Sequence, residues 1–482
     1  MGIMARMRKT VTGLISARAA EMGGAWLADG PADERNAMAA KKKLWRQIYK
    51  NEAPWLRPGR IHSANLAAIA VGDVARLVTM DLKARVVGDE RIAKTFTREA
   101  MWDIRNHVEY GLALGGFVMK PYAWGDDVRV ALVLPREYEI LEVDTDGTIA
   151  DIKFFDHETG QEKVRVERHV FDGVAGICAI TNEVFEKGRP LKDAAAALKA
   201  VPRWANILPA QEIAGCEAPL FGFFRPATSN TVDMGGIHGV SFFDKAIPTI
   251  KLADEHLSAL VREFRLKEAR LYVDRDAIDM TVRGGGRLPH LEEDLYVKMD
   301  VDAGSGNGKV FFEVFSPDIR SAEYLSTFNK YQQLVEDCLG LMHGTFSMPD
   351  TTDRTATAVR ESKHRTYATV LSNQHALRQC LEEVMHAMAK YLGKDPGALE
   401  LALAFDDSLV RDPQETLRDM LADVSMGLVR PELYLAKKYG VTEEDAKAMM
   451  PKGTQLLRDG RTALTWNEAE LTADVRNDGG TE

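Results

Sequence analysis

The stretch Gly304-Ser305-Gly306-Asn307-Gly308 has the residue types of a ligand-binding loop. Such loops bind phosphate when a Lys-Ser or Lys-Thr pair follows and a helix N-terminus lies beside them. No such pair follows here, and the residues after Gly308 alternate as in a strand. We therefore expect a turn between strands at this position and no nucleotide site.

Residue types that bind metal ions occur without the spacing that a metal site needs. Asp144-Thr145-Asp146-Gly147 begins like a calcium loop, but Phe155 stands where the bidentate glutamate belongs, so an Asp-Gly hairpin turn is expected. Zinc sites use closely spaced pairs of ligands, and the four cysteines form no such pair. Those cysteines are Cys178, Cys216, Cys338 and Cys380.

Motifs of hydrolytic catalysis are absent from the sequence as well. It contains no G-x-S-x-G elbow, no H-E-x-x-H pair and no evident carboxylate dyad. His364, His375 and His386 share roughly one helix face but lack carboxylate partners, so we interpret them as surface or interface histidines. The sequence predicts no catalytic residue, no metal ion and no cofactor.

The elements that organise the chain run from Ser316 to Gly393, where two long helices are predicted with a loop between them. Ser316-Pro317-Asp318 supplies the start of the first helix, whose apolar residues recur at helical spacing as far as Met342. The second helix is predicted from between Asp353 and Thr357 to about Leu392. At about 1.5 Å per residue it is roughly 54 Å long, which suggests that it crosses between layers or subunits.

Another long helix is predicted from Ser241 to Phe264, with a kink at Pro248. Strands are expected at 269–273, 295–301 and 309–315, and the last two should pair as a hairpin. A β segment inserted between two long helices predicts a stalk that ends in a small β head.

The remaining elements alternate between helical and strand patterns, and the chain is assigned to the α+β class. Helices are predicted at 41–56, 65–82, 96–114 and 191–200. Strands are predicted at 117–122, 128–134, 139–143, 148–155, 163–171, 176–180, 220–225 and 399–405.

The composition restricts the class of protein. The 482 residues carry a formal net charge of -10, whereas proteins that read nucleic-acid sequence usually present a basic face. No apolar run approaches the roughly 18–20 residues of a membrane span. The scattered cysteines fit synthesis in a reducing, intracellular compartment. Residues 1–39 are expected to form an N-terminal arm and residues 463–482 a disordered tail.

Several short motifs occur in an order that resembles tailed-bacteriophage portal proteins (head–tail connectors) of the siphophage type. Each motif is weak alone, and the resemblance, which covers roughly 41–450, rests on their order and on the stalk. In Arg354-Thr355-Ala356-Thr357-Ala358-Val359 the family usually has glutamate where Ala358 stands. The others are Trp45-x-x-Ile48-Tyr49 with Pro54-Trp55, Gly115-Gly116 with Lys120-Pro121, the Asp144–Asp151 hairpin, Phe221–Asn230, and Gly239-Val240-Ser241-Phe242-Phe243 leading to Glu263.

The resemblance implies a portal-like fold with long stem and wing helices, a β-rich wing, a small β clip and a helical C-terminal crown. Its segments are a wing at 40–240, stem helices at 241–265 and 317–342, a clip at 266–316, a tunnel loop at 343–354, a long wing helix at 355–394 and a crown at 395–462.

It further implies a ring of twelve copies at the capsid vertex, made in the bacterial host cytoplasm and located in the virion. Its partners would be double-stranded DNA passing non-specifically, the terminase large subunit, a head–tail adaptor, and the major capsid and scaffolding proteins, with no membrane.

The resemblance also suggests which residues contact these partners. Candidates for the DNA channel are His343, Thr345, Phe346, Met348 and Arg354. Candidates for the channel or a subunit interface are Arg360, Lys363, His364 and Arg365, and candidates on the clip are Arg283, Arg287, Lys298 and Lys309. A solvated helix face is an equal alternative for Arg360, Lys363 and Arg365.

Two other interpretations stay open at this level. An intracellular enzyme with a β substrate domain and a helical oligomerisation domain would form a small oligomer with a ligand pocket. A phage structural protein other than the portal would form no free-standing ring.

Overall fold

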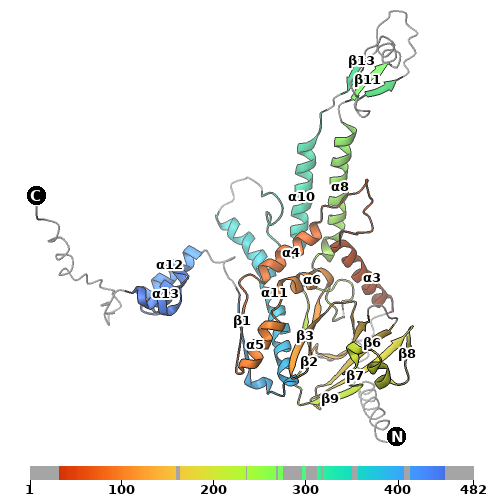
Figure 1. The fold of residues 1–482 in the computed structure, drawn as a ribbon. Coiled ribbons are helices and arrows are strands. Elements are labelled where there is room, and N and C mark those ends of the chain that lie inside the picture. The colour runs from red at the N-terminus through yellow and green to blue at the C-terminus, as the bar shows by residue number, and fades with distance from the viewer. Residues whose placement is uncertain are drawn as a thin grey trace, which may run out of the picture. The chain divides into compact units, whose positions relative to one another are not determined.

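The computed structural model divides into two compact units, Met1–Phe405 and Asp406–Glu482. Helices and sheets both contribute to the first unit (Figure 1). The residues that the structure describes are 32–158, 163–234, 236–267, 270–274, 296–299, 312–315, 318–349, 356–405 and 413–450.

Four helices open the described chain: α3 (Ala32–Tyr49), α4 (Leu66–Val78), α5 (Glu90–Glu99) and α6 (Ile104–Leu114). The single helix predicted at 96–114 is therefore wrong. Asp103 precedes α6 in a left-handed conformation, with φ of 55°, which cannot occur inside a right-handed helix. The turn at this residue separates α5 from α6.

Two antiparallel sheets follow, and most predicted strands are confirmed with shifts of one or two residues at their ends. The strand predicted at 176–180 extends to Glu186, and the strands Arg189–Pro190 and Ala210–Ala214 were not predicted. Asp144 and Gly147 form the hairpin turn between β4 and β5, as predicted, with Gly147 at a φ of 88°. The first sheet has the order β10-β2-β3, and the second has β4-β5-β6-β7-β8 with β9 also on β7. The bounds are β2 Phe117–Trp124, β3 Asp127–Val133, β4 Tyr138–Val143, β5 Ile149–His157, β6 Lys163–Asp172, β7 Ile177–Glu186, β8 Arg189–Pro190, β9 Ala210–Ala214 and β10 Gly222–Phe224.

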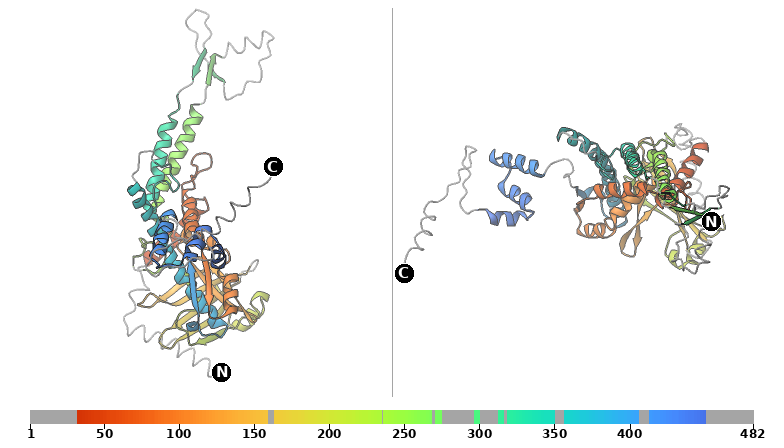
Figure 2. Two further views of the ribbon diagram at one scale, coloured as in Figure 1. Left: turned by 90° about the vertical axis from the view of Figure 1, so that its left-hand side faces the viewer. Right: turned by 90° about the horizontal axis from the view of Figure 1, so that it is seen from above.

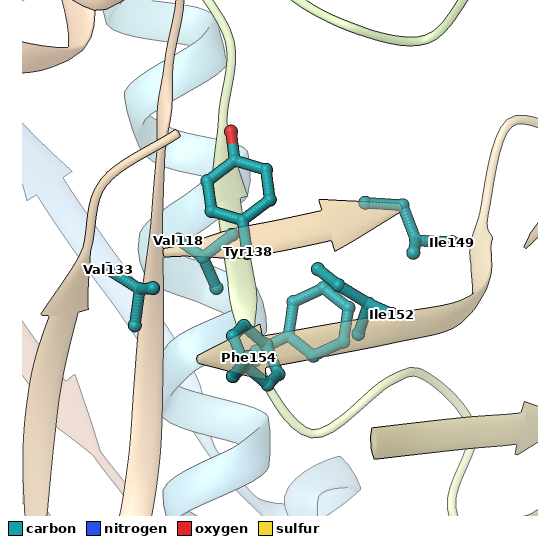
Figure 3. Packing of buried hydrophobic residues seen from close by; sticks show 7 residues of the cluster. Val118, Val133, Tyr138, Ile149, Ile152 and Phe154 are labelled. Carbon is teal, nitrogen blue, oxygen red and sulfur yellow. The ribbon is translucent and has the colours of Figure 1, made fainter. Parts of the chain in front are cut away.

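A buried cluster joins the two sheets (Figure 3). Burial of apolar area of this kind contributes about 25 cal/mol per Å² to folding, and alternation along each strand turns one set of side chains inward. The small helix α7 (Ala194–Lys199) covers part of β7. The members of the cluster are Val118, Val133, Tyr138, Ile149, Ile152, Phe154 and Phe221.

Two long helices, α8 (Ile247–Leu266) and α10 (Ser321–Leu339), lie side by side (Figures 1 and 2). The predicted kink at Pro248 does not occur, because Pro248 lies in the first turn of α8, where a missing N–H costs nothing. A short 3-10 turn, Asp244–Ala246, occupies the part of the predicted helix that precedes it. The second helix begins at Ser321, later than predicted, and Pro317 lies outside the described residues.

A three-stranded sheet is inserted in the chain between α8 and α10, as predicted, but its pairing differs. Strand β11 (Arg270–Asp274) is central, parallel to β12 (Tyr296–Met299) and antiparallel to β13 (Phe312–Phe315). The hairpin predicted between the last two strands is therefore wrong. Parallel strands cannot be joined by a tight turn, and residues 275–295 separate these two strands in the sequence.

Helix α11 (Ala356–Tyr391) is a single helix of 36 residues, as predicted. After it, β14 (Glu400–Ala404) pairs with β1 (Lys83–Val87), a strand that the sequence analysis missed. Residues 400–404 were expected in the crown, but this pairing ties them to the first unit. The second unit contains α12 (Pro413–Ser425), α13 (Pro431–Tyr439) and α14 (Glu443–Met449).

The contact between α11 and β10 leaves no room for a side chain at Gly222. A Cβ atom there would overlap the carbonyl oxygen of Cys380 and lie 2.6 Å from Cγ2 of Val384. We expect Gly222→Ala to lower the free energy of unfolding by about 1–3 kcal/mol, measured by urea denaturation.

A matched glycine in α4 provides the control. The nearest atoms to a Cβ at Gly72 are the Glu109 carboxylate oxygens at 3.7 Å, an ordinary contact, so Gly72→Ala should raise stability by about 0.5–1 kcal/mol. Equal effects of the two substitutions would contradict the packing argument.

Candidate functional site

The 340–349 loop connects α10 with the segment that leads to α11. Gly340 ends α10 in a left-handed conformation, with φ of 69°, and its N–H bonds back to the carbonyls of Glu336 and Asp337. The loop therefore begins at 340, and the predicted helix end at Met342 is too late. Residues 350–354 of the predicted tunnel loop lie outside the described part of the chain.

The buried carboxylate of Glu336 organises the loop. Its side chain belongs to α10 and is 0% exposed. Oε1 accepts hydrogen bonds from the backbone N–H groups of Phe346 at 2.8 Å and Ser347 at 2.9 Å. Oε2 accepts from Gly344 N at 3.3 Å and from the Ser347 hydroxyl at 2.7 Å. Because a buried charge is costly without partners, these four donors replace the water that the carboxylate loses.

Two amide side chains of α10 extend the same interaction. Asn329 Oδ1 accepts from Met348 N at 2.7 Å, and its Nδ2 donates to Met348 O at 3.1 Å. Gln332 Nε2 donates to Phe346 O at 3.2 Å. Asn329, Gln332 and Glu336 are spaced i, i+3 and i+7, which places them on one helix face. The sequence analysis missed these three residues, because α10 carries other polar side chains and their spacing alone does not set the three apart.

Helix α11 holds the other end of the loop. Thr366 Oγ1 accepts from Met342 N at 2.8 Å, and Thr369 Oγ1 donates to Gly340 O at 3.0 Å. Both hydroxyls therefore satisfy backbone groups that the end of α10 leaves without helical partners. Residues 340–342 of the loop are thus bound to α11, and residues 344–348 are bound to α10.

A charged cluster lies beside this attachment. Arg365 of α11 donates to Asp337 Oδ1 at 2.7 Å and to its carbonyl oxygen at 2.6 Å. His343 Nε2 lies 3.1 Å from the same Oδ1. Partial burial acts to raise the pKa of Asp337, but Arg365 and His343 outweigh it and hold that pKa below its ordinary value. The Arg365–Asp337 ion pair therefore joins α11 directly to α10.

A second ionic cluster joins α8 to α10 at the ends that lead to the inserted sheet. Glu263 accepts from Arg320 twice, at Oε1 (3.0 Å) and Oε2 (2.8 Å), and from the Tyr324 hydroxyl at 3.2 Å. Lys267 Nζ lies 2.7 Å from its Oε1. Hydrogen bonds from Arg320 and then Lys267 lower the pKa of the Glu263 carboxyl far below its ordinary value.

The structure places the predicted channel residues in different environments. Met348 is 75% exposed, whereas Thr345 and Phe346 are half-buried. The Thr345 hydroxyl donates to Met342 O, and the Phe346 N–H donates to Glu336. His343 is half-buried beside Asp337. Arg354 lies outside the described residues.

The other predicted cations are not brought together. Lys363 and His364 are exposed on α11, while Arg365 is exposed and paired with Asp337. The side chain of Arg360 lies outside the described part of α11. The same holds for the side chain of Lys298 in β12 and for all of Arg283, Arg287 and Lys309.

A surface hollow of about 820 Å³ lies between α5 and the turn of the β2–β3 hairpin. Its charged side chains pair with one another, as in Arg98 with Asp127 at 2.7 Å and Lys94 with Glu90 at 2.8 Å. Among the described residues, no three histidine, cysteine, aspartate or glutamate side chains are grouped so that they could hold a metal ion. Within that same part of the chain, every helix is too short or too polar to cross a bilayer.

Comparison with known proteins gives one family. The model described as "Phage portal protein, SPP1 Gp6-like" matches residues 88–453. No curated protein matches the chain.

Two solved structures are similar at a distance. The neck of a native GTA particle computed with C12 symmetry is 11% identical, with 89% of this chain and 99% of that chain covered and a TM-score of 0.45. The neck of an empty GTA particle computed with C6 symmetry is 11% identical, with 86% and 94% covered and a TM-score of 0.44. Both similarities are too distant to support a conclusion about this chain.

The ionic cluster at Glu263 should make stability depend on acid pH. Because its pKa is lower in the folded than in the unfolded chain, its stabilisation is complete above about pH 4.3 and is lost as pH falls towards the folded pKa. We expect Glu263→Gln to lower the melting temperature equally at pH 7 and pH 5, and by less at pH 3.5. Calorimetry of both proteins at the three pH values measures this.

The exposed pair of Glu90 and Lys94 serves as the control. Surface pairs contribute about 0–1 kcal/mol, so Glu90→Gln should change the melting temperature little at every pH. If Glu263→Gln lowered the melting temperature by the same amount at pH 7 and pH 3.5, the ion pairs of Glu263 would not be the source of the stabilisation.

Proposed function

The chain belongs to the SPP1 Gp6-like family of phage portal proteins, and on that premise we propose that it forms a ring of twelve copies at one capsid vertex. Double-stranded DNA passes through the axial channel of this ring during packaging and ejection. The observation that carries the proposal is the family match over residues 88–453, which includes α8, α10, the 340–349 loop and α11. Because the family is structural, no enzymatic activity is part of the proposal.

Each part of the structure has a role in this proposal. Helices α8 and α10 form the stem, and the β11–β13 sheet forms the clip. The 340–349 loop and the residues up to 354 form the tunnel loop. The β10-β2-β3 sheet, the β4–β8 sheet and α11 form the wing. The C-terminal helices α12–α14 form the crown.

Exposed apolar side chains on the stem helices support assembly into a ring. A closed ring is a heterologous assembly, so each copy needs two different faces that fit together. Apolar residues exposed to solvent on a monomer mark such interaction sites, since their burial stabilises the contact. They are Leu252, Phe264 and Leu266 on α8, with Leu325 and Leu334 on α10.

The charge balance supports passage of DNA without tight binding. Each cation that neutralises a phosphate adds affinity through release of counterions, and it would slow a sliding duplex. The chain carries a net charge of -10, the exposed residues of the described loop are the uncharged Met348 and Pro349, and the nearby Arg365 is paired with Asp337. Met348 is therefore our candidate for contact with DNA.

The other partners follow from the same role. The clip would bind the terminase large subunit during packaging and a head–tail adaptor afterwards, with Arg283, Arg287, Lys298 and Lys309 as candidate contacts. The wing would contact the major capsid and scaffolding proteins. The protein would be made in the bacterial host cytoplasm and end in the virion.

A charge on the stem surface should prevent ring closure without unfolding the chain. Leu325 is 56% exposed, so Leu325→Glu costs the folded chain little but buries a carboxylate in the proposed interface. We expect the variant to shift from rings to smaller species in analytical ultracentrifugation, with an unchanged circular dichroism spectrum.

Val174 in the β6–β7 turn is 80% exposed and provides an apolar control away from the stem. Val174→Glu should leave the proportion of rings as it is in the wild type. If Leu325→Glu also leaves the proportion of rings unchanged, the proposed interface on the stem helices is wrong.

Replacement of residues 344–352 by a short Gly-Ser linker tests the loop in DNA translocation. We expect the variant to form rings and to be incorporated into capsids, but to package little DNA, as measured by nuclease-protected DNA per capsid. Packaging at the wild-type level would contradict the role of the loop.

A further inference from the structure

We propose that Glu336 is a positioning residue for DNA passage, which makes residues 340–348 a fixed part of the channel wall and presents Met348 outward. This inference rests on the proposed function, and it adds that the described half of the loop does not move independently of the stem.

The first argument is saturation of the carboxylate. A carboxylate offers about four lone-pair positions, and the four donors from residues 344–347 occupy two on each oxygen of Glu336. The Ser347 hydroxyl in turn accepts from Gly344 N at 3.0 Å. If the segment moves away, the Phe346 and Ser347 amides and the Ser347 hydroxyl lose their acceptor together, while Gly344 N keeps only the Ser347 hydroxyl.

The second argument is burial. Because Glu336 is 0% exposed, the carboxylate depends on these protein donors and not on bulk water in this conformation. An unsatisfied buried charge is far more costly than an unsatisfied neutral group. The conformation of residues 344–347 is thus the one in which the carboxylate is satisfied.

The third argument is attachment at both ends. Asn329 bonds both backbone groups of Met348, while Thr366 and Thr369 bond Met342 and Gly340. These anchors belong to α10 and α11, so the segment is joined to two helices. A force applied to Met348 would therefore be transmitted to both helices.

The chemistry explains why glutamate, and not glutamine, suits this position. A glutamine keeps one acceptor oxygen but replaces the other with an NH₂ donor, which would face the donor groups of Gly344 or Phe346. The remaining amide oxygen can still accept from Phe346 N and Ser347 N, but it is neutral, and hydrogen bonds to a charged acceptor are about twice as strong. Glu336→Gln therefore preserves the volume of the side chain, removes the acceptor of the Ser347 hydroxyl and weakens the bonds to the two amides.

The test begins with assembled rings of the full chain and hydrogen exchange, which needs no DNA. We expect Glu336→Gln to accelerate exchange of the amides of Phe346 and Ser347 by about tenfold, since their buried acceptor becomes neutral and its bonds weaken. Glu323→Gln, an exposed acid on the same helix, should leave exchange of these amides unchanged. Unchanged exchange in Glu336→Gln would overturn the inference.

The second measurement concerns function and uses the same variants in a packaging assay. We expect Glu336→Gln rings to assemble normally but to package DNA several-fold more slowly than Glu323→Gln rings. Met348→Ala should add little to the defect of Glu336→Gln, because both changes act through the position of one side chain.

Two outcomes separate this inference from the proposed function. If exchange accelerates and packaging stays at the rate of Glu323→Gln, while replacement of residues 344–352 abolishes packaging, then the loop acts on DNA and Glu336 does not position it. If replacement of the loop also has no effect, the proposed function of the loop fails and the positioning role fails with it.

Discussion

The polar side chains of α11 satisfy backbone groups of segments that are far apart in the sequence, and the first unit depends on these bonds. Because α11 is one unbroken helix of 36 residues, it holds all of these segments in a fixed relation. The backbone groups lie in the 340–349 loop, the end of α4, β10 and the residues after it, and β14. The side chains are Thr366, Thr369, Asn373, Gln374, Arg378 and Glu383.

Buried acids repeat this principle elsewhere in the unit. Asp244 accepts from the indole of Trp45 at 2.7 Å, and Asp254 accepts from the indole of Trp55 at 2.8 Å and from Ala64 N. These bonds tie the N-terminal segments to the base of α8, as Glu336 ties the loop to α10. A carboxylate suits the task because hydrogen bonds to a charged acceptor are about twice as strong as neutral ones. Asp244 and α8 are thus joined to the N-terminal segments by directional bonds.

Periodicity predicted most helices and strands, since burial on one face leaves a repeat in the sequence. It failed where tertiary contacts decide: β1 is a strand because β14 pairs with it, and β11 lies between two strands that follow it in the chain. The order of weak motifs predicted the family. The predictions for Met348 and the clip cations rest on that resemblance, whereas Glu336 was missed because a buried acid on a helix looks like any surface acid until its partners are known.

The mass of the assembly tests the central claim most directly. Native mass spectrometry of the purified chain, with electron micrographs of the same sample, measures the number of copies and shows whether a channel is present. The account predicts a particle of about twelve times 53.5 kDa with a central hole in end-on views. A compact dimer or tetramer without a hole would contradict it.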